Sequence, residues 1–518
     1  MEMKKKFIMI FAAAFSAISC QLDFVPTDSG SGDDLMKNAS SAISTIDGIY
    51  RSMWTAGWST GGNSHQCFGI SAYNLALESM GDDFIMQSAG SGWFWYDHCY
   101  NIKAYYMSDS FRSYDVWYAN YTWISNANYV LAAKNTMAGS DVDKSYVFGS
   151  AYAIRGLSYF NLANWYARPP YSAMQDKYRW DDPGLPIYTE PTDKGFVGKK
   201  RENLRTVFKQ INDDLDSAIV FLGRGEKSVL AGGKSHISLN VARALKVRVA
   251  LATGDWQTAL DNAELVIKSE EYEIGGESEL MGGMNSISAS NVMWGAGIEN
   301  TEQSGAYAGF FTHMDNTDGA YAESAPKLIS SNIYKKMEPD DIRRRWWNPD
   351  NEDSPYISEK FRFSNVASWL GDYIYMRVEE MYFDAAEAAL RLGDADKAVE
   401  YVNAVMSKRS TSYDAGRYTA STYLGATSVT WTGSLLENIL IQKRIELWGE
   451  FGRLIDIRRL GQGIDRKSAD GFADECLTTM SRNGVNLNNP DTYDWVMTIP
   501  QDEINNNPNI NEEDQNPL

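Results

Sequence analysis

The chain has 518 residues, of which 44% are hydrophobic and 13% are aromatic, and its formal net charge is −20. This length is enough for several ordinary domains or for one large assembly of repeats. The negative charge repels nucleic acid, which we exclude as a partner.

The first twenty residues have the layout of an export signal. Lysines at positions 4–6 are followed by a short apolar run from Phe7 to Phe15. That run is too short to span a bilayer, and small residues lead from it to Cys20. This arrangement resembles the lipobox of bacterial lipoproteins, although Ala17 stands where leucine is more common. We therefore expect a lipoprotein signal peptide over residues 1–19 and lipidation of Cys20. The alternative is an ordinary cleaved signal with an unrelated cysteine.

The rest of the chain is expected to form one folded unit behind a tether. Residues 20–36 are polar and turn-rich, which is typical of a tether, and one globular domain follows over 37–518. We divide this domain into an N-terminal part of about 37–268, a loop-rich insertion of about 269–371 and a C-terminal part of about 372–518. No later segment is apolar and long enough to span a membrane. Three later cysteines allow at most one intramolecular disulfide, which excludes a disulfide scaffold.

An unusually aromatic stretch, SGWFWYDHCYN, occupies residues 91–101. A glycine-rich turn precedes it and no helical period is visible, so the pattern favours an extended segment. Alternate side chains of an extended segment face the same way, so Trp93 and Trp95 would share one face. Phe94 and Tyr96 would then point into the core. The alternative is that both tryptophans simply pack inside the protein.

Helical periodicity dominates much of the N-terminal part. The helix predicted within 151–167 must end by Arg168, because two prolines follow it. A second amphipathic helix is predicted over 206–222. Ser238 is expected to cap a helix that starts at Leu239. The nearby AGGKS sequence lacks the strand and the earlier glycine of a phosphate-binding loop, so we reject that function.

Two later segments share the pattern Leu-x-x-Gly-Asp-x-x-x-Ala, at 251–267 and 390–406. Gly254 and Gly393 mark the turn of each, and the pattern resembles the tetratricopeptide helix–turn–helix unit. About 140 residues separate the two glycines, so long insertions must split the repeats. The insertion is rich in glycine, asparagine, serine and aromatic residues, which predicts long ordered loops with short strands.

Charged and apolar residues interleave over 441–461, which predicts an internal ion-pair network with each partner within a turn or two. An anion-binding site is the alternative. On a helix upstream, we expect Arg377 to pair with Glu380 and Glu387 to pair with Arg391.

Metal and catalytic signatures are weak throughout. The four histidines never fall at metal-ligand spacing, so we expect no metal site among them. Asp82 and Asp83 could ligate a structural cation such as calcium, but the pattern favours the end of a helix.

Five blocks, in order along nearly the whole chain, resemble the SusD/RagB family of Bacteroidetes surface lipoproteins. The tail departs from the family by ending at Leu518 without the usual Gly-Tyr close. The blocks are the lipobox with CQLDFVPTDS, SAYAIRGLSYFNLANWYARPPY with GLPIYTEPT, YIYMRVEEMYFDAAEAALRLGD, IQKRIELWGEFGRLIDIRRLG, and IPQDEINNNPNINEEDQNPL.

The resemblance implies a mainly α fold, in which four tetratricopeptide-like helix pairs form a superhelical scaffold with loop-rich insertions and short strands. It implies a binding protein with no catalytic residues and no cofactor. Family members sit on the outer face of the outer membrane through a lipid anchor. They pair with a SusC-like TonB-dependent transporter and capture oligosaccharides for it. This capture serves polysaccharide utilisation and nutrient uptake. A minority branch handles peptides.

Sugar capture needs aromatic faces for stacking and polar groups for the hydroxyls. The resemblance places a Trp-x-Trp pair and a nearby asparagine in the 91–101 stretch. Exposed rings of the insertion are further candidates. The predicted glycan site is therefore Trp93, Trp95, Asn101, Trp294, Tyr307 and Phe310. The alternatives are a peptide-binding member of the family, a secreted helical glycoside hydrolase with two carboxylates across a cleft, and a purely structural surface lipoprotein.

Overall fold

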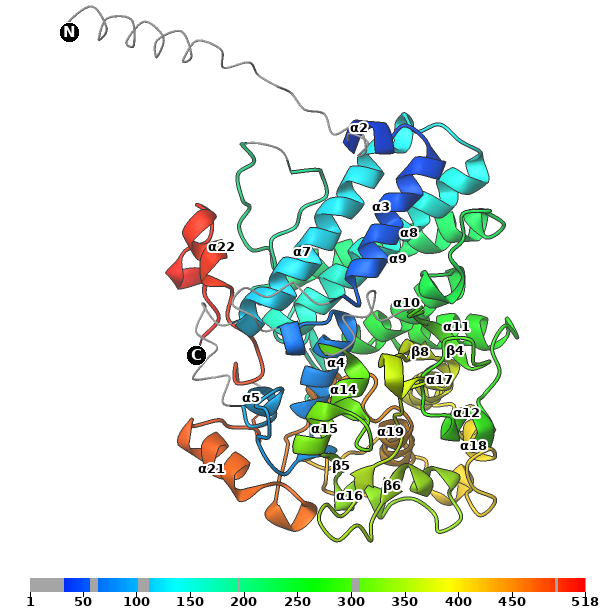
Figure 1. The fold of residues 1–518 in the computed structure, drawn as a ribbon, viewed down its shortest axis with the longest axis vertical. Helices are drawn as coiled ribbons and strands as arrows, with labels where there is room; N and C mark the ends of the chain where they lie inside the picture. The colour runs from blue at the N-terminus through cyan, green and yellow to red at the C-terminus, as the bar shows by residue number, and fades with distance from the viewer. Residues whose placement is uncertain are drawn as a thin grey trace, which may run out of the picture.

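A computed structural model describes residues 32–55, 64–100, 111–192, 195–299, 308–489 and 492–517. The signal peptide, Cys20 and most of the predicted tether lie outside these ranges. Helices dominate the molecule and the strands are few and short, so the mainly α prediction is confirmed (Figure 1). Within the described ranges, no helix combines the length and the apolar character needed to cross a membrane.

Long helices of the N-terminal part lie side by side and form the upper layer of Figure 1. Helix α8 ends at Tyr166, before the two prolines, and α9 covers the predicted 206–222. Both helices begin with a polar cap: the Ser140 hydroxyl accepts from the Asp143 N–H, and the Asn203 side chain accepts from the Thr206 N–H. The helices of this layer are α2 (Gly32–Leu35), α3 (Ala39–Ser52), α7 (Phe111–Ala132), α8 (Asp141–Tyr166) and α9 (Leu204–Gly225).

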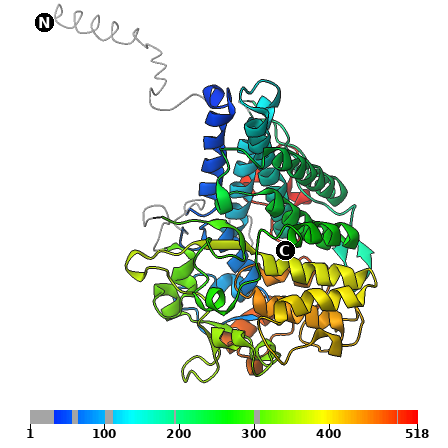
Figure 2. The same ribbon diagram turned by 90° about the vertical axis from the view of Figure 1, so that its right-hand side faces the viewer.

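The two predicted repeat units are helix pairs, α10 (Leu239–Thr253) with α11 (Trp256–Ile267) and α17 (Val378–Arg391) with α18 (Ala395–Met406). Ser238 caps α10 as predicted, by accepting from the Val241 N–H at 3.2 Å. Gly254 closes α10 with a φ of 72°, a left-handed conformation that favours glycine. Although the pairs are far apart in sequence, α11 packs against α17 and joins them into one stack (Figure 2).

Shorter helices surround these layers, many of them in the insertion and the C-terminal part. They are α4 (Ile70–Ser79), α5 (Trp95–His98), α12 (Glu277–Met281), α14 (Phe310–Met314), α15 (Ala320–Ser324), α16 (Ser331–Tyr334), α19 (Leu435–Glu446), α20 (Arg453–Leu460), α21 (Asp474–Arg482) and α22 (Gln501–Asn506).

Within the described residues the strands pair antiparallel in three small sheets, and those of the insertion are short, as predicted. The first sheet has the order β1 (Phe84–Met86), β5 (Lys327–Ile329), β7 (Ile357–Ser358) and β6 (Trp347–Asn348). The others are β2 (Tyr171–Ser172) with β3 (Lys177–Tyr178), and β4 (Val292–Ala296) with β8 (Tyr373–Arg377).

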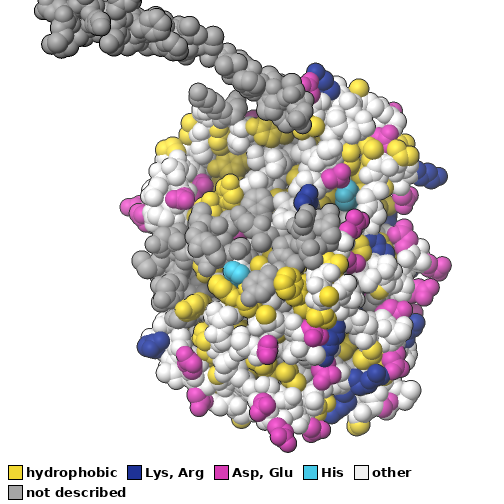
Figure 3. All heavy atoms as spheres, viewed as in Figure 1, with side chains coloured by type: hydrophobic (Ala, Val, Ile, Leu, Met, Phe, Trp, Pro, Cys, Tyr) yellow, Lys and Arg dark blue, Asp and Glu magenta, His cyan; other side chains and the backbone are white. Residues whose placement is uncertain are grey.

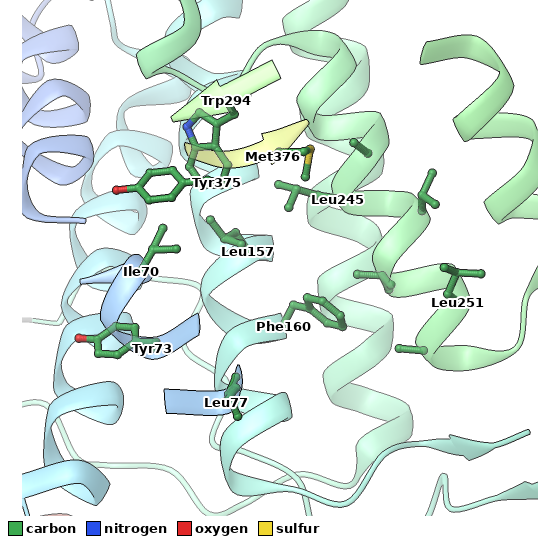
Figure 4. Packing of buried hydrophobic residues seen from close by; sticks show 14 of the residues in the cluster. Ile70, Tyr73, Leu77, Leu157, Phe160, Leu245, Leu251, Trp294, Tyr375 and Met376 are labelled. Carbon is green, nitrogen blue, oxygen red and sulfur yellow. The ribbon is translucent and has the colours of Figure 1, made fainter. Parts of the chain in front are cut away.

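The hydrophobic core joins the helical layers to the β4–β8 pair. Figure 4 shows side chains of α4, α8, α10 and both strands meeting in one cluster. Gly69 allows the chain to enter this cluster, because its φ is +76° and a Cβ atom there would lie 1.9 Å from the Met53 carbonyl oxygen. That oxygen accepts from the Ile70 N–H at 2.8 Å and fixes the start of α4.

Beneath the C-terminal helices lies a buried network that we call the ion-pair core. Arg409, Arg377 and Arg343 all donate to the Glu446 carboxylate, at 2.9–3.2 Å. Burial favours the neutral carboxyl, but the three guanidinium groups outweigh it and hold the pKa of Glu446 well below its usual range. Its members are Arg343, Lys360, Arg377, Glu379, Arg409, Glu446 and Glu450.

The network confirms the structural interpretation of the 441–461 charges, but its partners mostly come from distant elements. The predicted Arg377–Glu380 pair is wrong, because Glu380 instead pairs with Arg248 at 2.6 Å. The Glu387–Arg391 pair is present at 3.6 Å, and Glu387 also binds Arg459.

Asp82 and Asp83 also form buried ion pairs with arginines. Their carboxylates bind Arg444 and Arg453, at 2.6 Å between Asp83 and Arg444 and 3.1 Å between Asp82 and Arg453. Helix α4 has already ended at Ser79, so the prediction that this pair ends a helix is wrong. Across the described ranges, no group of three or more His, Cys, Asp or Glu side chains is placed to hold a metal ion.

Candidate functional site

The described part of the aromatic stretch, residues 91–100, is turned and helical rather than extended. Residues 95–98 form α5, and Phe94 before it has a left-handed φ of 62°. Trp95 is buried, whereas Trp93 is only half-buried. Tyr96, expected beneath the platform, is instead 40% exposed. The prediction that Trp93 and Trp95 share one face is therefore wrong, and Trp93 alone remains a candidate platform.

A buried ion pair holds this turn in place. The Arg112 guanidinium donates two hydrogen bonds to the Asp97 carboxylate, both at 3.0 Å, and a third to the Gln66 carbonyl oxygen. The Gln66 side chain in turn accepts from the Phe94 N–H at 3.0 Å. Burial raises the pKa of Asp97, although Arg112 opposes the shift. These contacts fix the strained Phe94 backbone and leave Trp93 at the surface.

Trp93 stacks on a histidine that the sequence interpretation did not select. The rings of Trp93 and His65 are 4.9 Å apart and nearly parallel, with an angle of 8° between their planes. Tyr321, from α15, places its hydroxyl 2.5 Å from His65 Nδ1, and its ring meets Trp93 edge-on at 6.1 Å. His65, Trp93, His313 and Tyr321 form what we call the aromatic face.

His313 is the buried support of the aromatic face. Its Nε2 donates to the His65 carbonyl oxygen at 2.6 Å, and its ring stacks on Phe68 at 5.6 Å. Burial, aided by the charge of Lys327, lowers the pKa of His313 well below its usual value, so this imidazole is neutral. Its Nδ1 is buried and has no hydrogen-bond partner in the described structure.

The aromatic face therefore offers one indole backed by a fixed imidazole. Figure 3 shows hydrophobic side chains gathered around a histidine near the middle of this side of the molecule. A flat indole backed in this way can stack against the C–H face of a ligand ring, with hydroxyl groups nearby for hydrogen bonds. No sequence pattern pointed to His65 or Tyr321, because they lie far apart in the chain and meet Trp93 only in the fold.

Of the other predicted site residues, the two that the structure describes, Trp294 and Phe310, do not join Trp93 at the surface. Trp294 lies in β4 and is 1% exposed, with its ring 4.9 Å from that of Tyr375. Phe310 lies at the start of α14 and is buried among Phe311, Phe361 and Tyr373. Asn101, Tyr307 and the lipidation residue Cys20 lie outside the described residues.

Several buried carboxylates of the described residues are held inside the fold rather than at the aromatic face. The carboxylates of the ion-pair core bind guanidinium groups and are shielded from water. Burial raises the pKa of Glu78 to about 7, but this carboxylate accepts from the N–H groups of Gly449 and Arg453 inside the helix packing. These acidic groups therefore stabilise the fold.

The fold is a scaffold of helix pairs, and the aromatic face lies on short helices and a turn outside those pairs. Residues 356–518 match the model of the SusD family, and residues 62–251 match that of a family described as starch-binding and associating with the outer membrane. Together the two matches cover more than half of the chain. The chain belongs to the SusD/RagB family.

Solved structures of this family share the fold at low sequence identity. A SusD-like carbohydrate-binding protein from Bacteroides vulgatus is 23% identical, with a TM-score of 0.73 over 93% of this chain and 98% of that chain. A SusD superfamily protein from Bacteroides thetaiotaomicron gives the same identity and TM-score, over 93% and 100%.

Surface glycan-binding protein A from Bacteroides thetaiotaomicron is 14% identical, with a TM-score of 0.64 over 91% of this chain and 98% of that chain. At these identities the likeness establishes the fold alone. Among curated proteins, none matches this sequence significantly.

Proposed function

We propose that this protein is a lipid-anchored glycan-binding protein on the outer face of the outer membrane. In this proposal it captures oligosaccharides and delivers them to a SusC-like TonB-dependent transporter. It breaks no bond and needs no cofactor. The half-buried Trp93, held against His65 in a fixed orientation, is the observation that carries the proposal.

The family supports the same class of ligand. One matching family model is described as starch-binding, and the similar solved structures include proteins described as carbohydrate-binding and glycan-binding. A sugar ring has a face of weakly positive C–H groups, which is attracted to the negative face of an indole. The lipobox-like sequence before Cys20 supports the membrane anchor.

The decisive experiment measures glycan binding by calorimetry and by retardation in polysaccharide-containing native gels. Trp93→Ala is compared with Trp256→Ala, which removes another half-buried tryptophan from the scaffold helix α11. We expect Trp93→Ala to weaken binding at least tenfold, about 1.4 kcal/mol, and Trp256→Ala to leave it unchanged. Equal binding by both variants would show that Trp93 is not the platform.

Three further measurements separate the alternatives. Binding of peptides but of no oligosaccharide would assign the chain to the peptide-binding branch. Release of reducing sugar by the purified protein would favour a glycoside hydrolase. Finally, co-purification from outer membranes with a TonB-dependent transporter tests delivery, and isolation of the intact protein without one would contradict that part of the proposal.

A further inference from the structure

We propose that a pocket separate from the aromatic face, which we call the Trp294 pocket, binds a single neutral sugar ring. This inference rests on the proposed glycan-binding function and adds a second contact point to it. The pocket lies between α3, the chain that follows the short 3-10 helix η3 (Gly233–Ser235), and the β4–β8 strand pair.

The pocket has the size and the walls of a site for one ring. Its volume is about 260 Å³, which equals the space of roughly nine water molecules. Aromatic side chains from three elements form the walls, and polar groups lie between them. The residues that matter here are Asp47, Arg51, Trp54, His236, Trp294 and Tyr375.

An unpartnered donor lines this pocket. The indole Nε1 of Trp294 is buried and has no hydrogen-bond acceptor in the described part of the chain. Figure 4 shows this nitrogen and the Tyr375 hydroxyl on the same side of the strand pair, toward α3. A buried N–H without an acceptor costs about 1–3 kcal/mol, so a ligand oxygen that reaches this nitrogen would be bound favourably.

Two of the remaining polar groups, His236 and Asp47, hold each other in position. His236 Nε2 lies 3.2 Å from the Asp47 carboxylate, and its Nδ1 lies 2.9 Å from the Tyr146 hydroxyl. The His236 ring also stacks on Tyr50 at 4.4 Å. A ligand therefore meets a prearranged histidine and carboxylate rather than mobile side chains, which reduces the entropy lost on binding.

The charge of the pocket favours a neutral ligand. Asp47 carries a negative charge and the guanidinium of Arg51, which has no ion-pair partner among the described residues, a positive one, so the two formal charges cancel and give neither an anion nor a cation a net advantage. Together with the Trp294 N–H, these groups supply both donors and acceptors. The hydroxyl groups of a neutral sugar need that mixture.

A larger cavity nearby has no unpartnered buried side-chain polar atom among its described lining residues. It has a volume of about 360 Å³, and its lining residues include Tyr146 and Lys234. The Tyr146 hydroxyl accepts from the Gly232 N–H, and Lys234 donates to the Ala289 carbonyl oxygen. The buried side-chain polar atoms of its described lining residues have hydrogen-bond partners, so none of them needs a ligand atom as a partner.

The experiment follows the indole N–H signals of the ¹⁵N-labelled full protein by NMR. Trp294→Phe and Trp347→Phe assign two signals by their loss, since both indole nitrogens are buried without a partner in the described structure but only Trp294 lines the pocket. Glucose, galactose, mannose, xylose and N-acetylglucosamine are then titrated at millimolar concentrations. We expect at least one of them to shift the Trp294 signal saturably and to leave the Trp347 signal in place.

Asp47→Asn provides the affinity test, because the Asp47 side chain is 54% exposed and its replacement leaves the core intact. We expect it to weaken binding of the responding sugar about tenfold. If no sugar moves the Trp294 signal, or if it moves only together with that of Trp347, the pocket proposal is wrong. Unchanged affinity in Asp47→Asn contradicts it as well.

The outcomes also separate this proposal from the proposed function. Glycan binding that depends on Trp93 while the Trp294 signal stays fixed overturns the pocket and leaves the proposed function standing. A saturable shift at Trp294, with polysaccharide binding indifferent to Trp93→Ala, supports the pocket and overturns the role of Trp93.

Discussion

The ion-pair core and the aromatic face differ in how their side chains are paired and exposed. In the ion-pair core, three guanidinium groups donate to the Glu446 carboxylate, and water is excluded. At the aromatic face, Trp93 keeps part of its surface open and the buried Nδ1 of His313 has no partner in the described structure. The shared charge of Glu446 stabilises the fold, whereas the part of the Trp93 ring that stays open is where the proposed ligand would stack.

The largest expected effect comes from breaking the ion-pair core. Glu446→Gln removes the charge shared by Arg343, Arg377 and Arg409 and leaves these guanidinium groups buried without it. We expect the free energy of unfolding to fall by about 5 kcal/mol, measured by urea denaturation. Glu277→Gln is the matched control, because its pair with Arg345 is exposed and should contribute less than about 0.5 kcal/mol. Similar losses in both variants would contradict the comparison.

Trp95→Ala tests whether Trp95 belongs to the hydrophobic core or to the glycan platform. Trp95 is 6% exposed, so its removal should cost about 3 kcal/mol of stability through lost packing. We expect the folded variant to bind glycans as the wild type does, measured by calorimetry well below its melting temperature. Loss of glycan binding with unchanged stability would show that Trp95 is part of the glycan site.

Lys327 is an intermediate case, a buried ammonium group beside the aromatic face that has no carboxylate partner in the described ranges. Its Nζ donates to the Ala325 carbonyl oxygen, and burial lowers its pKa to about 7. The folded pKa is below that of an unfolded lysine, so the unfolded chain binds more protons between about pH 7 and pH 10. Stability should therefore rise with pH across that window.

Lys327→Met should remove this pH dependence. We expect it to stabilise the protein by several kcal/mol near pH 7, with the gain fading toward pH 10. The measurement is urea denaturation across this pH range, with Lys335→Met, which changes an exposed lysine, as the control. Equal pH dependence in Lys327→Met and the wild type would show that Lys327 does not cause it.

The smallest effect is expected in the scaffold, at Gly254→Ala. The backbone there is left-handed, and the added Cβ atom would lie 2.7 Å from the ring of Tyr171, which together should cost about 1 kcal/mol. Thermal unfolding measures this loss, and glycan affinity should not change. Altered affinity would mean that the helix-pair turn contributes to the site.

Local patterns predicted the helical scaffold, because caps, prolines and turn glycines act within a few residues. Ser238, Gly254 and the end of α8 lie where the sequence indicated. The candidate site was less predictable. The turn at Phe94 depends on Gln66 and Arg112, and the stacking of Trp93 depends on His65. Those partners are 18–28 residues away along the chain, and no periodicity reveals them.

The separation of the two helix pairs bears on how this chain can fold. Each pair joins neighbouring helices through a tight turn, so it can form soon after its residues meet. Docking α11 onto α17 instead closes a loop of more than one hundred residues, at an entropic cost of about 4 kcal/mol. A ten-residue connection would cost about 2 kcal/mol. Because this cost grows only logarithmically, the scaffold tolerates a long insertion between two of its helices, and such insertions can change in length and sequence while the stack of helices stays the same.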